Sequence, residues 1–384
     1  MRIKILIGLI ILISLSLGGF FVYKNFSFQN KQKIEEKIKP LQSGEKIKIP
    51  EIETPEKTAK EKKVEKEKVK TVNIPKEILH NCIGFLIGST FEIETVKKIK
   101  AGWIRPHPGP FVWGFIEKSK GNYDFSITDN FVKTAQNNNV AILATIWPFA
   151  EWDQKTCSPK TCQVSFEDQF YFELPKSRCA PCNMENYKQF LKKLVERYDG
   201  EGINDMRGLK IPIKYYEILN EPEMREPFLT FFKGTEKEYV EILKASFEAI
   251  KEVCPDCKVL HGGVAGIEPK MISFWSKVFD LGAEKYFDIA NIHFINFGDR
   301  NTLNVKPFKD LLERKKIKKP IWVTEAEYGK DKNQEIESTV EKALLEGAKK
   351  IFFTKFVIGS SAPPIPGQYS TQYINITSKC NLIK

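Results

Sequence analysis

The sequence lacks the short motifs that bind nucleotides or a catalytic zinc ion. It contains no G-x-G-x-x-G, no Walker loop and no H-E-x-x-H, and only four of its 384 residues are histidine. It shows no internal repeat beyond an alternation of strand and helix patterns. Its mean hydropathy of −0.33 excludes a protein with many membrane spans. We therefore expect neither a cofactor nor a bound metal.

An excess of one charge sign is missing from most of the chain. The formal net charge is +11, but residues 24–77 hold 15 Lys against 10 Glu, and Arg2 and Lys4 add to that excess. Residues 78–384 are close to balanced and have no large field that would attract a polyanion. We expect no nucleic-acid partner. Hydrophobic residues make up 42% and charged residues 28%, which is typical of a folded protein.

The one long apolar run lies at the N-terminus, at residues 5–22. At 1.5 Å per residue it reaches about 27 Å as a helix, close to the thickness of a bilayer core. Arg2 and Lys4 precede it, which favours a cytoplasmic N-terminus. We expect residues 1–23 to be a transmembrane anchor or, alternatively, a cleaved signal segment. Either places the rest of the chain outside the cytoplasm, membrane-anchored or secreted.

Residues 24–77 are rich in Lys, Glu, Ile and Pro and carry no apolar stripe. Such a segment cannot bury enough surface to offset the entropy lost on ordering. We interpret it as a charged, flexible linker; an arm that binds a cell wall or lipid is the alternative.

Eight cysteines follow the apolar run, and an even number in an exported chain favours disulfides. The spacing of Cys157, Cys162, Cys179 and Cys182 favours two disulfides but also fits a structural zinc site. Cys254-Pro-Asp-Cys257 has redox spacing, yet it ends a long helical pattern, so a local structural bridge is favoured. The disulfide candidates are Cys82, Cys157, Cys162, Cys179, Cys182, Cys254, Cys257 and Cys380.

Residues 78–384 alternate short apolar runs with amphipathic stretches. A helix pattern follows every run but the last, and the runs are 82–88, 102–107, 140–147, 213–222, 258–266, 287–296, 320–329 and 350–359. Eight such units predict an α/β fold of the (β/α)8 TIM-barrel type, whereas a doubly wound sheet would give the same alternation without the count of eight. The longest insertion, 148–182, follows the third strand. After the eighth strand we expect the last helix to be missing or replaced by extended structure.

Cys82 begins the first strand, and Cys380 follows the eighth strand. These two strands are neighbours when a barrel closes. A bridge between Cys82 and Cys380 would therefore staple the seam of the barrel.

Two glutamates stand at the ends of predicted strands, where barrels carry their catalytic side chains. Glu221 ends the fourth strand, and Glu325 ends the seventh. Paired carboxylates with separated pKa values can serve as a general acid and a nucleophile, as glycosidic cleavage requires. Asn220 offers an amide for a sugar hydroxyl, and the apolar Trp147 could help to keep Glu221 protonated. The alternative is that both glutamates cap helices or form surface ion pairs.

The segments ILNEPE (218–223) and IWVTEAEYG (321–329) resemble the acid/base and nucleophile strands of retaining glycoside hydrolases of clan A. Residues 102–147 resemble the second and third strands of its β-xylosidase-like, β-galactosidase-like and endo-glycanase-like families. The resemblance implies cleavage of β-glycosidic bonds in oligo- or polysaccharides, with Glu221 as acid/base and Glu325 as nucleophile about 5–5.5 Å apart. A barrel that binds carbohydrate without cleaving it, and a transglycosylase, are the alternatives.

Further substrate-binding candidates follow from strand position and from the resemblance. An Arg at the place of Arg105 hydrogen-bonds the nucleophile in the family, and a His often stands where His293 does. Trp147 and Trp152 flank the exit of the third strand and could stack on sugars, with core packing as the alternative. Tyr328 and His107 are weaker candidates, and His261 is left unassigned.

The chain departs from the family pattern at two places. Ile295 stands where many members have a Tyr, and Lys355 or Phe356 where many have a Trp. Because of these two departures, the resemblance does not identify which sugar is bound.

Overall fold

A computed structural model describes residues 71–157, 162–165, 174–225, 229–293, 303–326, 335–354 and 376–382. The predicted membrane segment 1–23, most of the predicted linker, and Tyr328, Ile295, Lys355 and Phe356 lie outside these residues. Within the described ranges, no helix has the length and apolar character needed to cross a bilayer.

Eight parallel strands form a nearly closed barrel in the order β7-β6-β5-β2-β1-β10-β9-β8. Isolated parallel bridges between Leu260 and Ile289 and between Val264 and Ile292 join the two ends of the sheet, β7 and β8. This closure identifies a (β/α)8 TIM barrel and excludes the open doubly wound sheet. The strands are β1 (Ile83–Ile87), β2 (Trp103–Pro106), β5 (Ala141–Ile146), β6 (Tyr215–Ile218), β7 (Lys258–His261), β8 (Ala290–His293), β9 (Ile321–Ala326) and β10 (Ala348–Phe353).

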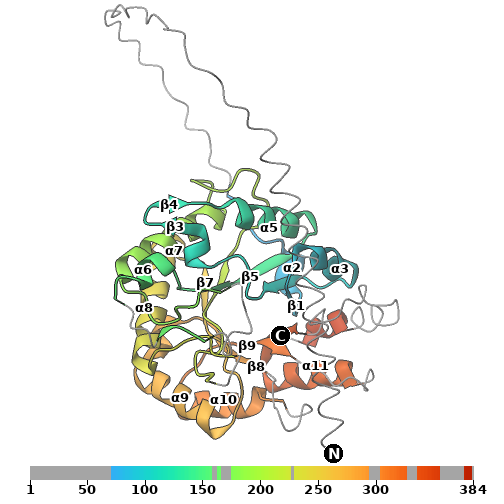
Figure 1. Ribbon diagram of the computed structural model, residues 1–384. Helices are drawn as coiled ribbons and strands as arrows, with labels where there is room; N and C mark the ends of the chain where they lie inside the picture. Colours follow the sequence, from blue (N-terminus) through green and yellow to red (C-terminus); the bar gives the residue numbers. More distant parts are fainter. Residues whose placement is uncertain are drawn as a thin grey trace, which may run out of the picture. The chain divides into compact units, whose positions relative to one another are not determined.

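A helix follows each of the first seven barrel strands, and these helices surround the strands (Figure 1). They are α3 (Ile93–Lys98), α5 (Ser126–Asn137), α7 (Met184–Tyr198), α8 (Glu236–Val253), α9 (Pro269–Asp280), α10 (Val305–Arg314) and α11 (Glu335–Glu346). Shorter elements decorate the connections: α2 (Lys76–His80), α4 (Trp113–Ile116), α6 (Glu151–Gln154), the hairpin β3 (Glu117–Ser119) and β4 (Asn122–Tyr123), and the 3₁₀ turns Thr90–Glu92, Ala283–Tyr286 and Lys379–Leu382.

Local sequence signals determine where several of these helices begin. The Asn183 side chain accepts the N–H of Asn186 at the start of α7. Thr235 and Glu238 form a capping box at the start of α8, and Pro269 is the first residue of α9. Each device satisfies or removes an N–H group that the first turn leaves without an intrahelical partner.

The interior of the barrel has an apolar lower layer and a polar upper layer. The lower layer, near the N-terminal ends of the strands, contains Trp103, Leu143, Tyr215, Ile289 and Trp322, which belong to one apolar cluster. Two residues further along the same strands stand Arg105, Thr145, Glu217, Asn291 and Thr324, all fully buried. Because side chains two apart in a strand share a face, the same inward-facing positions supply both layers.

Residues 71–80 pack against the N-terminal end of the barrel. The N–H of Val72 donates to the carbonyl of Gly200 at 2.8 Å, and Ile74 is buried. The indole N–H of Trp103 donates to the carbonyl of Ile78, and the Lys350 ammonium donates to the carbonyl of Leu79. Packed structure therefore includes residues 71–77, the last part of the segment that we expected to be linker.

All eight cysteines are paired in disulfides. The bridges are Cys82–Cys380, Cys157–Cys182, Cys162–Cys179 and Cys254–Cys257. The expected seam bridge and the local Cys254–Cys257 bridge are both present, and two nested disulfides occupy the insertion after β5 in place of a zinc site. Such a set of disulfides suggests an extracytoplasmic location.

After β10, where we expected the last helix to be missing or replaced by extended structure, the described residues form a short helical turn. Residues 376–382 are helical, and Lys379 forms ion pairs with Glu337 and Glu341 of α11. No helix pattern is visible in this part of the sequence because the turn is too short to show one. The turn brings Cys380 to the start of β1.

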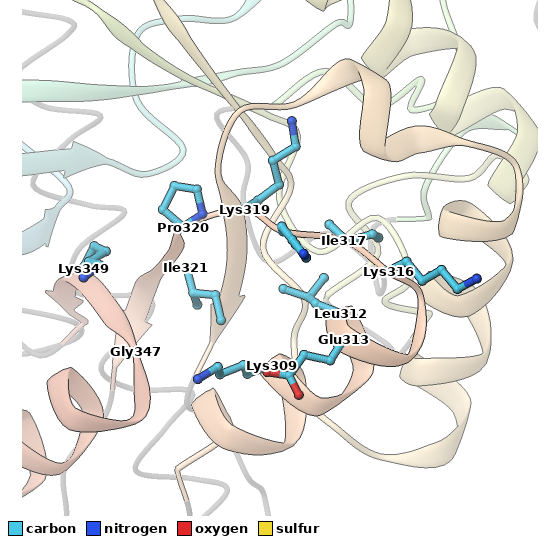
Figure 2. A pocket seen from close by; sticks show the side chains of 11 residues that line it. Lys309, Leu312, Glu313, Lys316, Ile317, Lys319, Pro320, Ile321, Gly347 and Lys349 are labelled. Carbon is cyan, nitrogen blue, oxygen red and sulfur yellow. The ribbon is translucent and has the colours of Figure 1, made fainter.

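A groove of about 680 Å³ lies at the N-terminal ends of β9 and β10, opposite the end that carries Glu221 and Glu325. Lysines dominate its lining, which includes Lys309, Lys316, Lys318, Lys319 and Lys349. Figure 2 shows that the ammonium groups of Lys309, Lys316 and Lys319 point in different directions. The lysines do not converge on a point where one anion could bind.

Replacing Cys82 and Cys380 together by Ser should lower the free energy of unfolding by about 2–5 kcal/mol, because the bridge closes a loop with a sequence separation of 298. Urea unfolding of the oxidised protein measures this. The matched control replaces Cys254 and Cys257, whose separation is 3. An equal or larger loss in the control would contradict a stapling role for the seam bridge.

Candidate active site

The end of β6 bends sharply and projects Glu221 over the barrel. Leu219 and Glu221 both adopt positive φ, at 65° and 39°, a region that residues with a Cβ rarely enter. The N–H of Met224 donates to the carbonyl of Glu221 and closes the turn. Strained backbone of this kind persists where the surrounding structure holds it, and it is concentrated at functional sites.

Glu221 and Glu325 face one another across the C-terminal end of the barrel, with His293 beside them. One side-chain oxygen of each glutamate and one ring nitrogen of His293 lie within 4.8 Å of one another. The His293 Nδ1 is 2.7 Å from Glu221 Oε1 and 3.9 Å from Glu325 Oε2. Glu221 is 5% and Glu325 8% exposed, so neither is a solvated surface carboxylate.

Arg105 holds one of the two glutamates and not the other. Its Nη1 donates to Glu325 Oε1 at 2.7 Å, its Nε donates to Glu217 Oε2 at 2.6 Å, and its Nη2 donates to Asn220 Oδ1 at 2.5 Å. The guanidinium is fully buried, and these three acceptors fix its orientation. Arg105, Asn220 and His293 therefore converge on the carboxylate pair.

Glu217 is a central residue that the sequence did not single out. It is fully buried on β6, where Thr145 Oγ1 donates to its Oε2 at 2.7 Å and Asn291 Nδ2 to its Oε1 at 2.5 Å. The signal was present: Glu217 is a charged residue inside an apolar run, four residues before Glu221. A buried carboxylate in such a run needs a buried cation, and Arg105 is that cation.

Burial acts differently on the ionisable groups of the site. Burial raises the pKa of Glu221 to about 8, Arg105 opposes the shift, and Glu217 adds to it. Burial also raises the pKa of Glu325, while His293 and Arg105 act to lower it. Burial alone would lower the pKa of Arg105, but the carboxylates of Glu217 and Glu325 outweigh it and raise that pKa. Of Glu221 and Glu325, only Glu325 has the Arg105 guanidinium in direct contact to stabilise its charged form.

His293 lies between Glu221 and Thr324. Its Nε2 is 3.0 Å from Thr324 Oγ1, and burial lowers the pKa of the ring to about 4, so the ring is neutral near pH 7. A Cβ atom at Gly263 would collide with the His293 ring. Gly263 is therefore needed for the position of His293, a reason that no local sequence pattern displayed.

The two tryptophans predicted to stack on sugars are packed in the protein. Trp147 is 0% exposed, and its indole N–H donates to the carbonyl of Pro108 at 2.7 Å. Trp152 is partly buried, donates to the carbonyl of Glu117 and packs edge-on against Trp113. This burial agrees with the core-packing alternative, because Trp147 offers no exposed face to a sugar.

The remaining histidine candidates differ in position. His261 is a core residue: its Nδ1 donates to the carbonyl of Gly262, its Nε2 accepts the N–H of Asn291, and its ring packs on Trp275. His107 is buried beside Trp147 near the rim of the site.

Glu221, His293 and Glu325 are also close enough to be considered as ligands of a cation. We interpret them otherwise, because the Arg105 guanidinium already provides the positive charge at Glu325, and Glu221 and His293 are hydrogen-bonded to one another.

No protein-family model matches the chain, and no curated protein matches its sequence. Solved structures match its fold. A family 39 glycoside hydrolase from Bacteroides cellulosilyticus WH2 aligns with a TM-score of 0.54 and 15% identity, over 79% of this chain and 65% of that chain. The chain thus spans slightly less than two thirds of that protein.

Two further structures extend the comparison. A GH39 β-xylosidase from Caulobacter crescentus aligns with a TM-score of 0.53 and 14% identity, over 81% of this chain and 71% of that one. Xylanase 10B from Thermotoga petrophila RKU-1, solved in complex with xylobiose, aligns with a TM-score of 0.50 and 17% identity, over 80% of this chain and 98% of that one. At these identities the likeness concerns the fold: the chain has the TIM barrel found in these glycoside hydrolases, in agreement with the resemblance of its sequence.

Proposed function

We propose that this protein is a retaining glycoside hydrolase that cleaves β-glycosidic bonds in oligo- or polysaccharides. The observation that carries the proposal is the buried pair Glu221 and Glu325, with Arg105 bonded to one and His293 to the other. The structural likeness to glycoside hydrolases agrees with it.

The two glutamates take different roles because their partners differ. Glu325 receives a charge-assisted hydrogen bond from Arg105, which favours the carboxylate that a nucleophile needs. Glu221 has a neutral imidazole as its partner, and burial raises its pKa to about 8, which favours the protonated form that a general acid needs.

The separation of the pair supports retention of configuration. Oxygens of the two carboxyl groups lie within 4.8 Å, which fits the roughly 5–5.5 Å of retaining enzymes and leaves too little room for the water that an inverting enzyme places between them. Glu325 attacks the anomeric carbon while Glu221 protonates the departing oxygen. Glu221 then removes a proton from the water that releases the sugar from Glu325.

Asn220 is the proposed contact for the sugar hydroxyl next to the anomeric carbon. The side-chain oxygen of Asn220 already accepts a hydrogen bond from Arg105, so its amide nitrogen is the group left to bind a substrate. Such a hydrogen bond strengthens in the oxocarbenium-like transition state.

We also propose that residues 1–23 anchor the enzyme in a membrane or direct its secretion, with the barrel outside the cytoplasm. The four disulfides support the location. N-terminal sequencing of the mature protein distinguishes the two, because a cleaved signal segment is missing from it and an anchor is retained.

Glu325→Gln should abolish hydrolysis of aryl and alkyl β-glycosides alike, because no glycosyl-enzyme can form. Glu221→Gln should slow alkyl glycosides by roughly 10²–10⁴. It should slow formation of the glycosyl-enzyme from activated aryl glycosides much less, because their leaving groups need no proton. Burst kinetics with both substrate types, and the anomeric form of the first product by NMR, measure these effects.

Glu223→Gln is the matched control, because Glu223 is also buried, lies on the same turn, and has a pKa raised by burial to about 8. It should keep most of the activity. Near wild-type turnover in Glu325→Gln would overturn the assignment. Binding of many glycans without any product would favour the non-catalytic alternative, and transfer to an added sugar acceptor would favour the transglycosylase.

The pH profile of kcat/KM should be bell-shaped, with the alkaline limb near pH 8, because Glu221 must be protonated and its pKa is about 8. Arg105→Lys should move the acid limb to higher pH, since Lys cannot make the contacts to Glu217, Asn220 and Glu325 together. We expect kcat/KM at the optimum to fall roughly ten- to a hundredfold, the equivalent of one charged hydrogen bond. An unmoved acid limb would contradict the role of Arg105 at Glu325.

A further inference from the structure

A chain of buried hydrogen bonds links the inside of the barrel to Glu221. It runs from Glu217 and Asn291 through Thr324 to His293, and from His293 to Glu221. The first four residues of this chain are fully buried, so water is not an alternative partner for them. Each proton in the chain must therefore be assigned to a donor, and the assignments constrain one another.

The orientation of Asn291 comes first. Its Nδ2 lies 2.5 Å from Glu217 Oε1 and 3.3 Å from the carbonyl oxygen of His261, both of which only accept. The amide nitrogen must face them, so Asn291 Oδ1 is an acceptor on the other side.

Thr324 has a single hydroxyl proton. Its Oγ1 is 2.8 Å from Asn291 Oδ1 and 3.1 Å from Glu217 Oε1, and both of these oxygens are acceptors. The hydroxyl proton is therefore committed to them. Towards His293, Thr324 can only accept.

The tautomer of His293 follows. Its Nε2 is 3.0 Å from Thr324 Oγ1 and must carry a proton to bond there. In a neutral ring, Nδ1 then has a lone pair and no proton. Glu221 Oε1 lies 2.7 Å from Nδ1, a distance at which two unprotonated atoms would repel. One proton must lie between them, and a neutral ring leaves it on Glu221.

A β-bulge makes this arrangement possible. The register between β8 and β9 pairs Ile292 with Val323 but His293 with Glu325, so Thr324 is the extra residue of β9. Bulges turn successive side chains out of strict alternation. Thr324 and Glu325, although adjacent, both contact groups inside the barrel.

We propose that Thr324 is a positioning residue that fixes His293 as the Nε2–H tautomer and thereby holds the acid proton on Glu221 in the resting enzyme. The inference rests on the proposed function. During the first step the Glu221 O–H bond breaks and a bond from that proton to the departing oxygen forms. The Nδ1 lone pair then faces a carboxylate. The ring could switch tautomer only if Thr324 donated its hydroxyl proton to Nε2, and the contacts with Asn291 and Glu217 prevent this. Glu221 is left as a strong base, and its O–H bond re-forms when it takes a proton from the attacking water.

Thr324→Val tests the proposal, and Thr324→Ser is its matched control. Without the hydroxyl, His293 is free to adopt the Nδ1–H form and donate to the Glu221 carboxylate, which stabilises the ionised acid. The alkaline limb of kcat/KM should then move down by roughly one to two pH units. Thr324→Ser keeps the hydroxyl and should keep the limb in place. A purely structural Thr324 would lower activity evenly across pH, and an unmoved limb in a folded Thr324→Val would overturn the proposal.

Other ionisable groups near the pair are the same in both variants. They are Arg105 and His107 on and after β2, Glu217 and Glu223 on and after β6, His261 on β7, and Glu325 on β9. A difference between the Val and Ser variants therefore reports the hydroxyl.

Nitrogen-15 NMR of histidine-labelled protein gives a readout that needs no substrate. The chain has only four histidines, and His293→Gln identifies the signal. The resting wild type should show a protonated Nε2 and a bare Nδ1, and Thr324→Val should show the reverse. A doubly protonated ring or an Nδ1–H ring in the wild type would overturn the proposal. Full activity in Glu221→Gln would instead overturn the proposed function and leave this NMR result unaffected.

Discussion

The buried guanidinium of Arg105 is the interaction on which the rest of the site depends. Three carboxyl groups, those of Glu217, Glu221 and Glu325, lie in the same buried space, and Arg105 is the one described cation that bonds to any of them. Burying an uncompensated charge is costly, so one cation cannot support three carboxylates. Glu221, which has no hydrogen bond to Arg105, is the carboxyl whose protonated form is favoured, and burial raises its pKa to about 8. The division of roles proposed for Glu221 and Glu325 rests on this difference in contact with Arg105.

The barrel separates stability from chemistry along its axis. At the N-terminal end, Trp103, Tyr215 and Trp322 pack together beneath the Lys350 ammonium, which lies 4.4 Å from the centre of the Trp103 ring. Two residues further along the same strands, the side chains become Arg105, Glu217 and Thr324. Apolar side chains fill the N-terminal end of the barrel, and buried polar side chains that hydrogen-bond to one another fill the layer above it.

Sequence reasoning singled out the residues of the candidate site that stand at strand ends and passed over those inside strands. Glu221, Glu325, Arg105 and His293 interrupt apolar runs at positions where barrels place reactive groups. Glu217, Asn291 and Thr324 lie within the runs, and their importance depends on partners from other strands. Trp147 illustrates an ambiguity of another kind, since an aromatic residue beside a strand end fits a sugar platform and a core position equally well. Only the packed structure distinguishes the two.

In this fold, the strands and their C-terminal ends carry the groups proposed for catalysis, and the connections between the strands are separate parts of the chain. Among the described residues, the side-chain hydrogen bonds to Glu221 and Glu325 come from Arg105 on β2 and His293 on β8. The insertion after β5 is one such connection, and two disulfides hold it. TIM barrels vary their function largely through connections of this kind. Structures only 14–17% identical to this chain share its barrel. The departures from the family pattern at Ile295 and at Lys355 or Phe356 leave both glutamates of the proposed reaction in place.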